Sequence, residues 1–342
     1  MVDGAAPARG YETAADQAAP SVETSAKVRR LDWDTEDLLR AVRSYGERAA
    51  ILSVEDERTE ATSGEDLMRL IRGAAQQMTA DGVGPGDIVA IWAANAPAWI
   101  AVGLASAALG AVFAPIDAMV GAEEALPQIE ATGARVVFSD REKPSTAEGS
   151  PPWVLLSAIP SIEGSLPVTR VAPSAPMVLF RTSGTTGEPK IFTLSHRNIG
   201  WNVGTVAGAG LVEARDQVLL PLPMHHVYPW ITATLSAIAV GATLILPESA
   251  SGPHIATALR VSRPTVIIGV PRLYEAMLEG IRSKVRRSGW LAAGVFDALM
   301  GAAIRLNRSG GSGGAGWIAR TLTAPVRRSF APDLRLLVSA SP

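Results

Sequence analysis

Hydroxyl and glycine residues gather in one short run that ends in a lysine. The run consists of Thr182, Ser183, Gly184, Thr185, Thr186, Gly187, Glu188, Pro189 and Lys190. Glycines let the backbone turn sharply and approach an anion closely, hydroxyls donate to phosphate oxygens, and lysine adds a compact positive charge. The run therefore predicts a phosphate-binding loop. Its spacing differs from the Walker A pattern G-x-x-x-x-G-K-[ST], which argues against the P-loop class.

The elements on either side of this run are those that a phosphate loop needs. Met177 to Phe180 is predicted as a strand that leads into the run, and His196 to Val206 as the helix that follows. A flexible surface loop rich in serine, threonine and glycine is the alternative. The order of strand, loop, lysine and helix favours phosphate binding, because anions bind where a strand leads through a loop into a helix.

Strands and helices alternate through most of the chain after residue 30. The predicted strands are Ile51 to Val54, Ile88 to Trp92, Val112 to Pro115, Ala134 to Phe138, Trp153 to Leu156, Val218 to Leu220, Thr243 to Leu246, Val266 to Val270 and Leu334 to Val338. The predicted helices are 34–48, 63–77 with Ser63 as its cap, 98–109, 123–132, 230–240, 255–260, and 273–308 with a break near 288–289. This alternation predicts the α/β class, with doubly wound, mainly parallel sheets and helices on both faces.

The composition excludes several functional classes. The chain has no cysteine, which excludes a disulfide scaffold, a cysteine-ligated zinc site and a thiol nucleophile. A net charge of -2 gives no overall attraction to nucleic acid, and none is expected as a partner. Met1 to Arg30 is rich in alanine, proline, glutamate and threonine and lacks the apolar core of a signal peptide. We predict a disordered tail there.

Two long stretches, Ile88 to Ile116 and Gln217 to Pro247, contain no charged side chain. Each is longer than the roughly 20 residues that cross a bilayer. Prolines and polar residues interrupt both, including Asn95 in the first stretch and His225 in the second. We therefore interpret them as buried strand, turn and helix units of a parallel sheet.

Several segments together resemble the adenylate-forming superfamily of acyl-CoA synthetases, luciferases and peptide-synthetase adenylation domains. They are the glycine-rich run with residues 194–198, residues 86–91 with Asn95, Pro97 and Trp99, residues 110–112 with Pro115, and residues 221–228, 270–274 and 334–339. They follow one another in the family's order and extend over about Leu31 to Pro342. The resemblance implies an incomplete N-terminal adenylation domain, residues 31–342, without the family's small mobile C-terminal domain.

The resemblance implies a two-step reaction with ATP, Mg²⁺ and CoA. A carboxylic acid is first activated as acyl-AMP, and the thiol of CoA or of an acyl carrier then accepts the acyl group. The family's ATP-phosphate contacts correspond to Thr182, Ser183, Gly184, Thr185, Thr186, Gly187 and Lys190, with Thr182 also touching Mg²⁺. Its catalytic and acyl-binding residues correspond to His226, Val270 and Pro271.

Each of these roles has a structural alternative. His226 could be a core histidine with satisfied hydrogen bonds, His225 is expected to be structural, and Val270-Pro271 could simply end a buried strand. The sequence also departs from the family pattern at Arg181, Ile191 and Pro229. None of the three departures removes a phosphate contact.

The family also uses later motifs that these 342 residues do not contain. They include a Glu that binds Mg²⁺, an Asp that holds the ribose and a Lys of the C-terminal domain. We therefore expect no adenylation activity from this chain alone. The alternative is a non-catalytic protein that binds a nucleotide or a partner. The DNA beyond the Pro342 codon would distinguish the two readings, since an open frame with the missing motifs indicates an enzyme.

The long interval between Tyr274 and Leu334 resembles the long-chain fatty-acid branch of the family. Basic residues outnumber acidic ones in this part of the chain. The basic region 282–328 could be a solvated helical face or a surface that contacts a membrane, with Trp290, Phe296 and Trp317 as apolar partners. We expect a cytoplasmic protein, with peripheral contact at the inner membrane face as the second interpretation.

Overall fold

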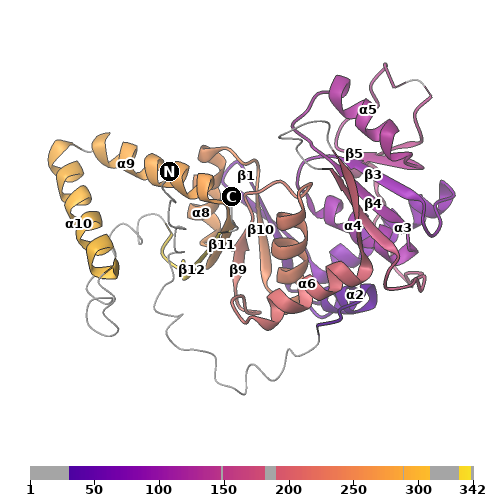
Figure 1. Cartoon of the computed structure of the whole chain (residues 1–342), viewed down its shortest axis with the longest axis horizontal. Helices are drawn as coiled ribbons and strands as arrows, with labels where there is room; N and C mark the ends of the chain where they lie inside the picture. The colour runs from indigo at the N-terminus through magenta and orange to yellow at the C-terminus, as the bar shows by residue number, and fades with distance from the viewer. Residues whose placement is uncertain (1–30, 148, 182–189, 288, 309–330, 340–342) are drawn as a thin grey trace, which may run out of the picture.

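The computed structural model describes residues 31–147, 149–181, 190–287, 289–308 and 331–339. Two six-stranded sheets stand beside each other with helices between them (Figure 1). The predicted tail Met1 to Arg30 lies outside the described residues.

The first sheet, sheet A, has the order β12-β11-β9-β10-β1-β2. Its strands are β1 (Ala49–Glu55), β2 (Arg58–Ser63), β9 (Gln217–Leu219), β10 (Thr243–Pro247), β11 (Val266–Gly269) and β12 (Leu336–Ser339). Neighbouring strands are parallel except for the antiparallel pair β1 and β2. Because parallel strands end at the same edge, the loops after β9, β10 and β11 all leave from one edge of the sheet.

The second sheet, sheet B, has the order β6-β5-β3-β4-β7-β8. Its strands are β3 (Ile88–Trp92), β4 (Val112–Ile116), β5 (Val136–Ser139), β6 (Trp153–Leu155), β7 (Pro176–Arg181) and β8 (Ile191–Ser195). Only β7 and β8 pair antiparallel. Strand β7 runs parallel to β4, so the loops after β3, β4 and β7 also share an edge.

Alternating side chains place three apolar layers around the two sheets, because successive residues of a strand point to opposite faces. Val89 and Ile91 of sheet B and Val218 and Leu244 of sheet A belong to one large core, which the intervening helices fill. The opposite face of sheet B packs on α5 (Ala122–Thr132). The opposite face of sheet A packs on α8 (Gly252–Ser262). Both sheets are thus covered on both faces, as predicted for the α/β class.

The helices of the middle layer begin and end at recognisable signals. They are α2 (Thr35–Arg43), α3 (Gly64–Ala80), α4 (Pro97–Leu109), α6 (His196–Gly208) and α7 (Ser236–Val240). Ser63 caps α3, as predicted, and the structure adds a capping box with Asp66. Pro97 occupies the first turn of α4, and Gly110 ends that helix at a φ of 71°, where glycine is favoured.

Two predictions of local structure were wrong, and two strands were missed. The helix predicted from 34 to 48 ends at Arg43, because the chain must turn to enter β1. Strands β2 and β8 were not predicted, and each is the antiparallel edge strand of its sheet. The segment predicted as one helix from 230 to 240 is a π-helix, η3 (Tyr228–Leu235), followed by α7.

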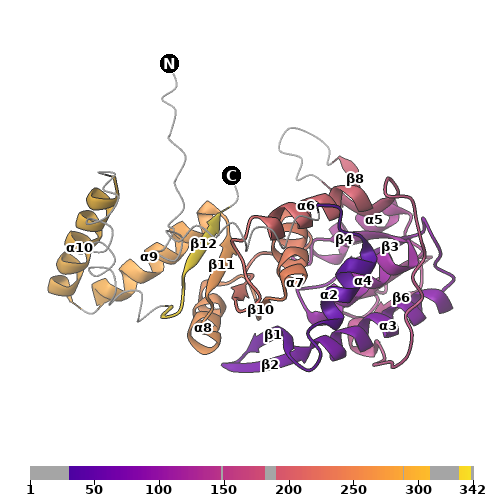
Figure 2. The same ribbon diagram turned by 90° about the horizontal axis from the view of Figure 1, so that it is seen from below.

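Two further helices follow β11 and extend away from sheet A. Helix α9 spans Pro271–Arg287 and α10 spans Trp290–Arg308, so the predicted break near 288–289 is confirmed. Figures 1 and 2 both show this helical pair at one end of the molecule, with α10 farthest from the sheets. Among the described residues, no helix is both long and apolar enough to cross a membrane.

Candidate functional site

A small cavity lies where the carboxyl ends of strands from both sheets meet. Its volume is ≈ 90 Å³, and its walls come from the loops after β3, β4, β9 and β10. The polar side chains in the wall are Asn95, Asp117, His225, Glu248 and Ser249. Ligands of doubly wound sheets bind at such carboxyl ends, so this cavity is the site that the topology favours.

Asn95 connects the two sheets at this edge. It lies between β3 and α4, and its side-chain Nδ2 donates to the carbonyl oxygen of Leu222 at 2.8 Å. The amide N–H of Met224 donates to the Oδ1 of Asn95 at 2.9 Å. Leu222 and Met224 follow β9 of sheet A, so one side chain of sheet B holds both sides of a turn that precedes His225.

His225 faces Asp117, which follows β4. The His225 Nε2 and Asp117 Oδ1 atoms lie 3.6 Å apart. Burial lowers the pKa of His225 to about 4, with a further lowering from His226 and a smaller opposing effect of Asp117. The imidazole is therefore neutral near pH 7, and the contact with Asp117 is not an ion pair at that pH.

The rings of His226 and His225 are in contact, with centroids 4.1 Å apart and planes tilted by 55°. The His226 residue is exposed. Partial withdrawal of its ring from water nevertheless lowers its pKa, and the carboxylate of Asp117 has a smaller opposing effect. A neutral, accessible imidazole can donate one hydrogen bond and accept another. His226 does not line the small cavity itself, whereas its neighbour His225 does.

The described residues next to and at the end of the glycine-rich run, Arg181 and Lys190, lie at the carboxyl end of β7. Arg181, the last residue of β7, pairs with Ile191, the first residue of β8. Lys190 directly precedes this pair and is exposed. The other predicted phosphate contacts, Thr182, Ser183, Gly184, Thr185, Thr186 and Gly187, lie outside the described residues. Since β7 is parallel to β4, Arg181 and Lys190 are at the same edge of sheet B as Asp117.

Val270 and Pro271 follow β11 at the corresponding edge of sheet A. Val270 is half-buried, and Pro271 begins α9. Strand β11 is the parallel neighbour of β9, which leads to His225. Tyr274 anchors this region because its hydroxyl lies 3.0 Å from the carbonyl oxygen of Ile267 and 2.6 Å from that of Val338. The fold thus brings the Val-Pro segment to the same edge as the histidines.

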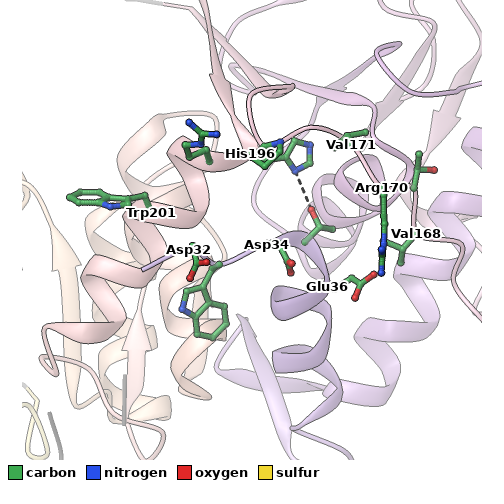
Figure 3. Close-up of a pocket in the computed structure, with 13 residues that line it drawn as sticks. Asp32, Asp34, Glu36, Val168, Arg170, Val171, His196 and Trp201 are labelled. Carbon is green, nitrogen blue, oxygen red and sulfur yellow. Dashed lines mark hydrogen bonds between the residues drawn. The ribbon is translucent and has the colours of Figure 1, made fainter. Parts of the chain in front are cut away.

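A larger cavity of ≈ 560 Å³ lies elsewhere, between the start of α2 and the start of α6 (Figure 3). His196 lines it and lies 3.2 Å from the hydroxyl of Thr35 through its Nδ1 atom. Ser195 pairs with Pro176, the first residue of β7, so this cavity is at the opposite end of that strand from the glycine-rich run. Its size alone therefore does not make it the nucleotide site.

Mg²⁺, which the resemblance implies, is bound in proteins by one or two carboxylates together with substrate phosphates. Within the described ranges, there is no cluster of three or more His, Asp or Glu that could hold a metal ion by itself. The protein contact that the resemblance implies for Mg²⁺ is Thr182, which lies outside the described residues.

The sequence patterns did not single out Asn95 and Asp117 as site residues. A usable signal exists, because each is a polar residue placed just after a buried strand: Asn95 three residues after β3 ends and Asp117 one residue after β4. Which loops face each other across two sheets depends on the strand order. That order is not encoded in any one segment.

Two mostly parallel sheets with a shared carboxyl edge define the N-terminal domain of adenylate-forming enzymes. The fold is similar to the N-terminal domain of FACL13 from Mycobacterium tuberculosis, with a TM-score of 0.59 and 22% identity. The match covers 71% of this chain and 64% of that one. It is also similar to o-succinylbenzoate CoA synthetase from Bacillus subtilis in complex with its acyl-adenylate, with a TM-score of 0.61, 21% identity, and 71% and 63% covered.

The chain belongs to the AMP-binding enzyme family, whose profile matches residues 38–334. It is 29% identical to a feruloyl-CoA synthase of Amycolatopsis over 62% of this chain and 44% of that protein. It is 27% identical to the long-chain-fatty-acid–CoA ligase FadD15 of Mycobacterium bovis over 78% of this chain and 48% of that protein. The chain thus spans about half the length of these curated relatives.

Proposed function

We propose that the protein takes part in the ATP-dependent activation of a carboxylic acid and its transfer to CoA. The observation that carries this proposal is the meeting of His225 and Asp117 at one edge, beside the strand end that leads into the glycine-rich run. Residues 31–342 supply part of the adenylation domain in this proposal. The remaining groups come from sequence that the longer relatives have and this chain does not span.

In the first step, a carboxylate oxygen of the acid attacks the α-phosphorus of ATP. The bond from that phosphorus to the bridging oxygen breaks, and pyrophosphate leaves with the electron pair. The protein's task is to hold the reactants in line and to stabilise the charge on the transferred group. Lys190 and the hydroxyls of Thr182, Ser183, Thr185 and Thr186 hold the β- and γ-phosphates. Thr182 would be a protein contact of Mg²⁺, which would supply positive charge to the phosphates of the bound nucleotide.

In the second step, the sulfur of CoA attacks the carbonyl carbon of acyl-AMP. The carbon–oxygen bond to the phosphate breaks, AMP leaves, and the thiol proton passes to solvent. In the first step, His226, neutral near pH 7 because partial burial lowers its pKa, donates a hydrogen bond to the carboxylate of the acid in this account. Val270 and Pro271 line the acyl group at the neighbouring strand end.

The acid in this proposal is a long-chain fatty acid. Two features support it: the long interval between Tyr274 and Leu334, which contains α9 and α10, and the similarity to a long-chain-fatty-acid–CoA ligase. An aromatic acid is the competitor, because a feruloyl-CoA synthase is similarly related. Competition between palmitate and ferulate for the same site distinguishes them. The proposal is supported if long aliphatic acids displace bound palmitate and ferulate does not. Preferential binding of ferulate contradicts it.

Peripheral contact with a membrane, through the basic region 282–328, would bring such an acid to the enzyme. The described part of this region presents Trp290, which is 81% exposed, and Val295, which is 59% exposed. Four basic residues end the preceding helix: Arg282, Lys284, Arg286 and Arg287. Apolar and basic side chains next to each other are typical of helices that lie on anionic membranes.

Calorimetric titration of the 342-residue chain with MgATP tests the proposed function. The Lys190→Ala variant should bind MgATP at least about tenfold more weakly, the equivalent of one charge-assisted hydrogen bond. Lys143→Ala is the matched control, because Lys143 is exposed and donates to the Ser150 carbonyl oxygen at 3.4 Å, away from the strand end of β7. Absence of MgATP binding by the unmodified chain, or equal binding by both lysine variants, would overturn the proposal.

A further inference from the structure

The segment that carries the two histidines is held from both sides. Asn95, which follows β3, binds one side, and side chains of α4 and β4 pack against the other. On one side, Asn95 donates to the Leu222 carbonyl oxygen and accepts from the Met224 amide. Both ends of the Asn95 amide are used, and the backbone partners fix which end is nitrogen and which is oxygen. The turn before His225 therefore cannot shift relative to sheet B without breaking two hydrogen bonds.

On the other side, Trp230 in the π-helix packs against α4. The ring centroids of Trp99 and Trp230 lie 4.9 Å apart, and those of Phe113 and Trp230 lie 5.8 Å apart. Trp230 is fully buried, and its amide donates to the carbonyl oxygen of His226 at 3.2 Å. His226 is thus connected by one backbone hydrogen bond to a residue that the core immobilises.

The segment also packs on the main core through Met224 and Val227, but the other polar contacts of the two histidines among the described residues are long. The His226 amide donates to the Pro223 carbonyl oxygen only at 3.4 Å, a long hydrogen bond. The His225–Asp117 separation of 3.6 Å also exceeds hydrogen-bond length. The two short bonds of Asn95 are accordingly the strongest polar restraint on this segment.

We propose that Asn95 is the positioning residue of the active site, and that its amide sets the placement of His225 and His226 relative to Asp117 and the strand end of β7. The catalytic interpretation of this role rests on the proposed function. The placement itself does not, because it concerns the protein without substrate. Asn95 touches no reacting atom in this account and acts only through the Leu222–Met224 turn.

Histidine-ring NMR of the Asn95→Ala variant tests the inference. In the unmodified protein, His225 should titrate near its lowered pKa of about 4. The groups that face it are Asp117 and His226. Loss of the Asn95 restraint should let the ring reach water and raise its titration midpoint by at least one pH unit, toward an ordinary histidine pKa of ~6.5.

Two further variants keep the test decisive. Asn202→Ala is the matched control, because Asn202 also donates to a backbone carbonyl oxygen, that of Asn198 at 2.8 Å, but on the exposed face of α6. Asn95→Gln keeps both amide groups but displaces them by one methylene, so it should give a smaller but measurable rise without adding a charge. An unchanged His225 midpoint in folded Asn95→Ala protein overturns the inference, whether or not the chain binds MgATP. Should Asn95→Ala fail to fold, the Asn95→Gln midpoint decides in the same way.

Discussion

The guanidinium of Arg335 donates two hydrogen bonds to the carboxylate of Asp216, at 2.9 and 2.5 Å, across 119 residues of sequence. Thr265 donates a third bond to the same carboxylate at 2.7 Å. Asp216 precedes β9, Thr265 precedes β11, and Arg335 precedes β12. This one carboxylate therefore fixes the starts of three neighbouring strands, two of which lead to proposed site segments.

Removing the charge of Asp216 should destabilise the fold. Its side chain is 1% exposed, whereas that of Arg335 is 19% exposed and retains some access to water. We expect Asp216→Asn to lower the free energy of unfolding by about 2–3 kcal/mol, less than the full cost of breaking a buried ion pair. Urea denaturation measures this. Asp333→Asn is the control, because its pair with Arg263 is exposed and worth at most ~1 kcal/mol.

The same carboxylate should make stability depend on pH. Burial would raise the pKa of Asp216, but hydrogen bonds from Arg335, the Glu213 amide and Thr265 outweigh burial and lower it. A lowered folded-state pKa stabilises the fold above the unfolded-state pKa of ~3.9. The stability difference between the unmodified protein and Asp216→Asn should therefore be constant from about pH 5 to 7 and shrink below about pH 4. A difference that instead shrinks as the pH rises contradicts this assignment.

Gly200 of α6 should not tolerate a side chain. A Cβ atom there would lie 1.7 Å from the carbonyl oxygen of Trp33, and that obstacle is backbone. Gly200→Ala should lower the free energy of unfolding by about 1–3 kcal/mol, as overpacked sites do. Gly280 of α9 is the matched control, since a Cβ there meets nothing within 4 Å. Gly280→Ala should be neutral or stabilising by up to ~1 kcal/mol. Equal effects in thermal unfolding would contradict the close packing of α6 on the Trp33 backbone.

The exposed tryptophan of α10 should matter for membrane contact. We expect the chain to sediment with vesicles containing phosphatidylglycerol at low salt, and Trp290→Glu to weaken this binding about fivefold, or roughly 1 kcal/mol. Trp201→Glu is the control, because Trp201 is 54% exposed on α6, away from the basic helices. Binding that is equal for phosphatidylcholine vesicles, or equal in both tryptophan variants, would count against a membrane surface at α9 and α10.

Local sequence signals predicted most elements of the fold. Ser63 marked the start of α3, Gly110 marked the end of α4, and Ser288-Gly289 marked the break between α9 and α10. These signals act within a few residues, so they can be recognised without knowing the fold. The buried parallel strands were equally clear, because runs covered on both faces are continuously apolar.

The elements that were missed depend on tertiary context. Strand β2 is polar and exposed over most of its length, and it exists because Asp56 and Glu57, at φ of 43° and 66°, reverse the chain. Asp-Glu is not the usual pair for such a turn. The π-helix exists where Trp230 must pack against Trp99, a contact between segments 131 positions apart that no local period encodes. The pairing of Asn95 with the Leu222–Met224 turn has the same origin.

The central claim is that the nucleotide site lies at the carboxyl ends of the strands, and the four histidines of the chain can report on it. His225 and His226 are at that edge. His196 lines the larger cavity at the other end of β7, and His254 lies in the first turn of α8. Histidine-ring NMR during a titration with MgATP is the most direct measurement. Our account predicts that the resonances of His225 and His226 shift while that of His196 stays in place. A shift confined to His196 would contradict it, because the nucleotide would then occupy the cavity between α2 and α6.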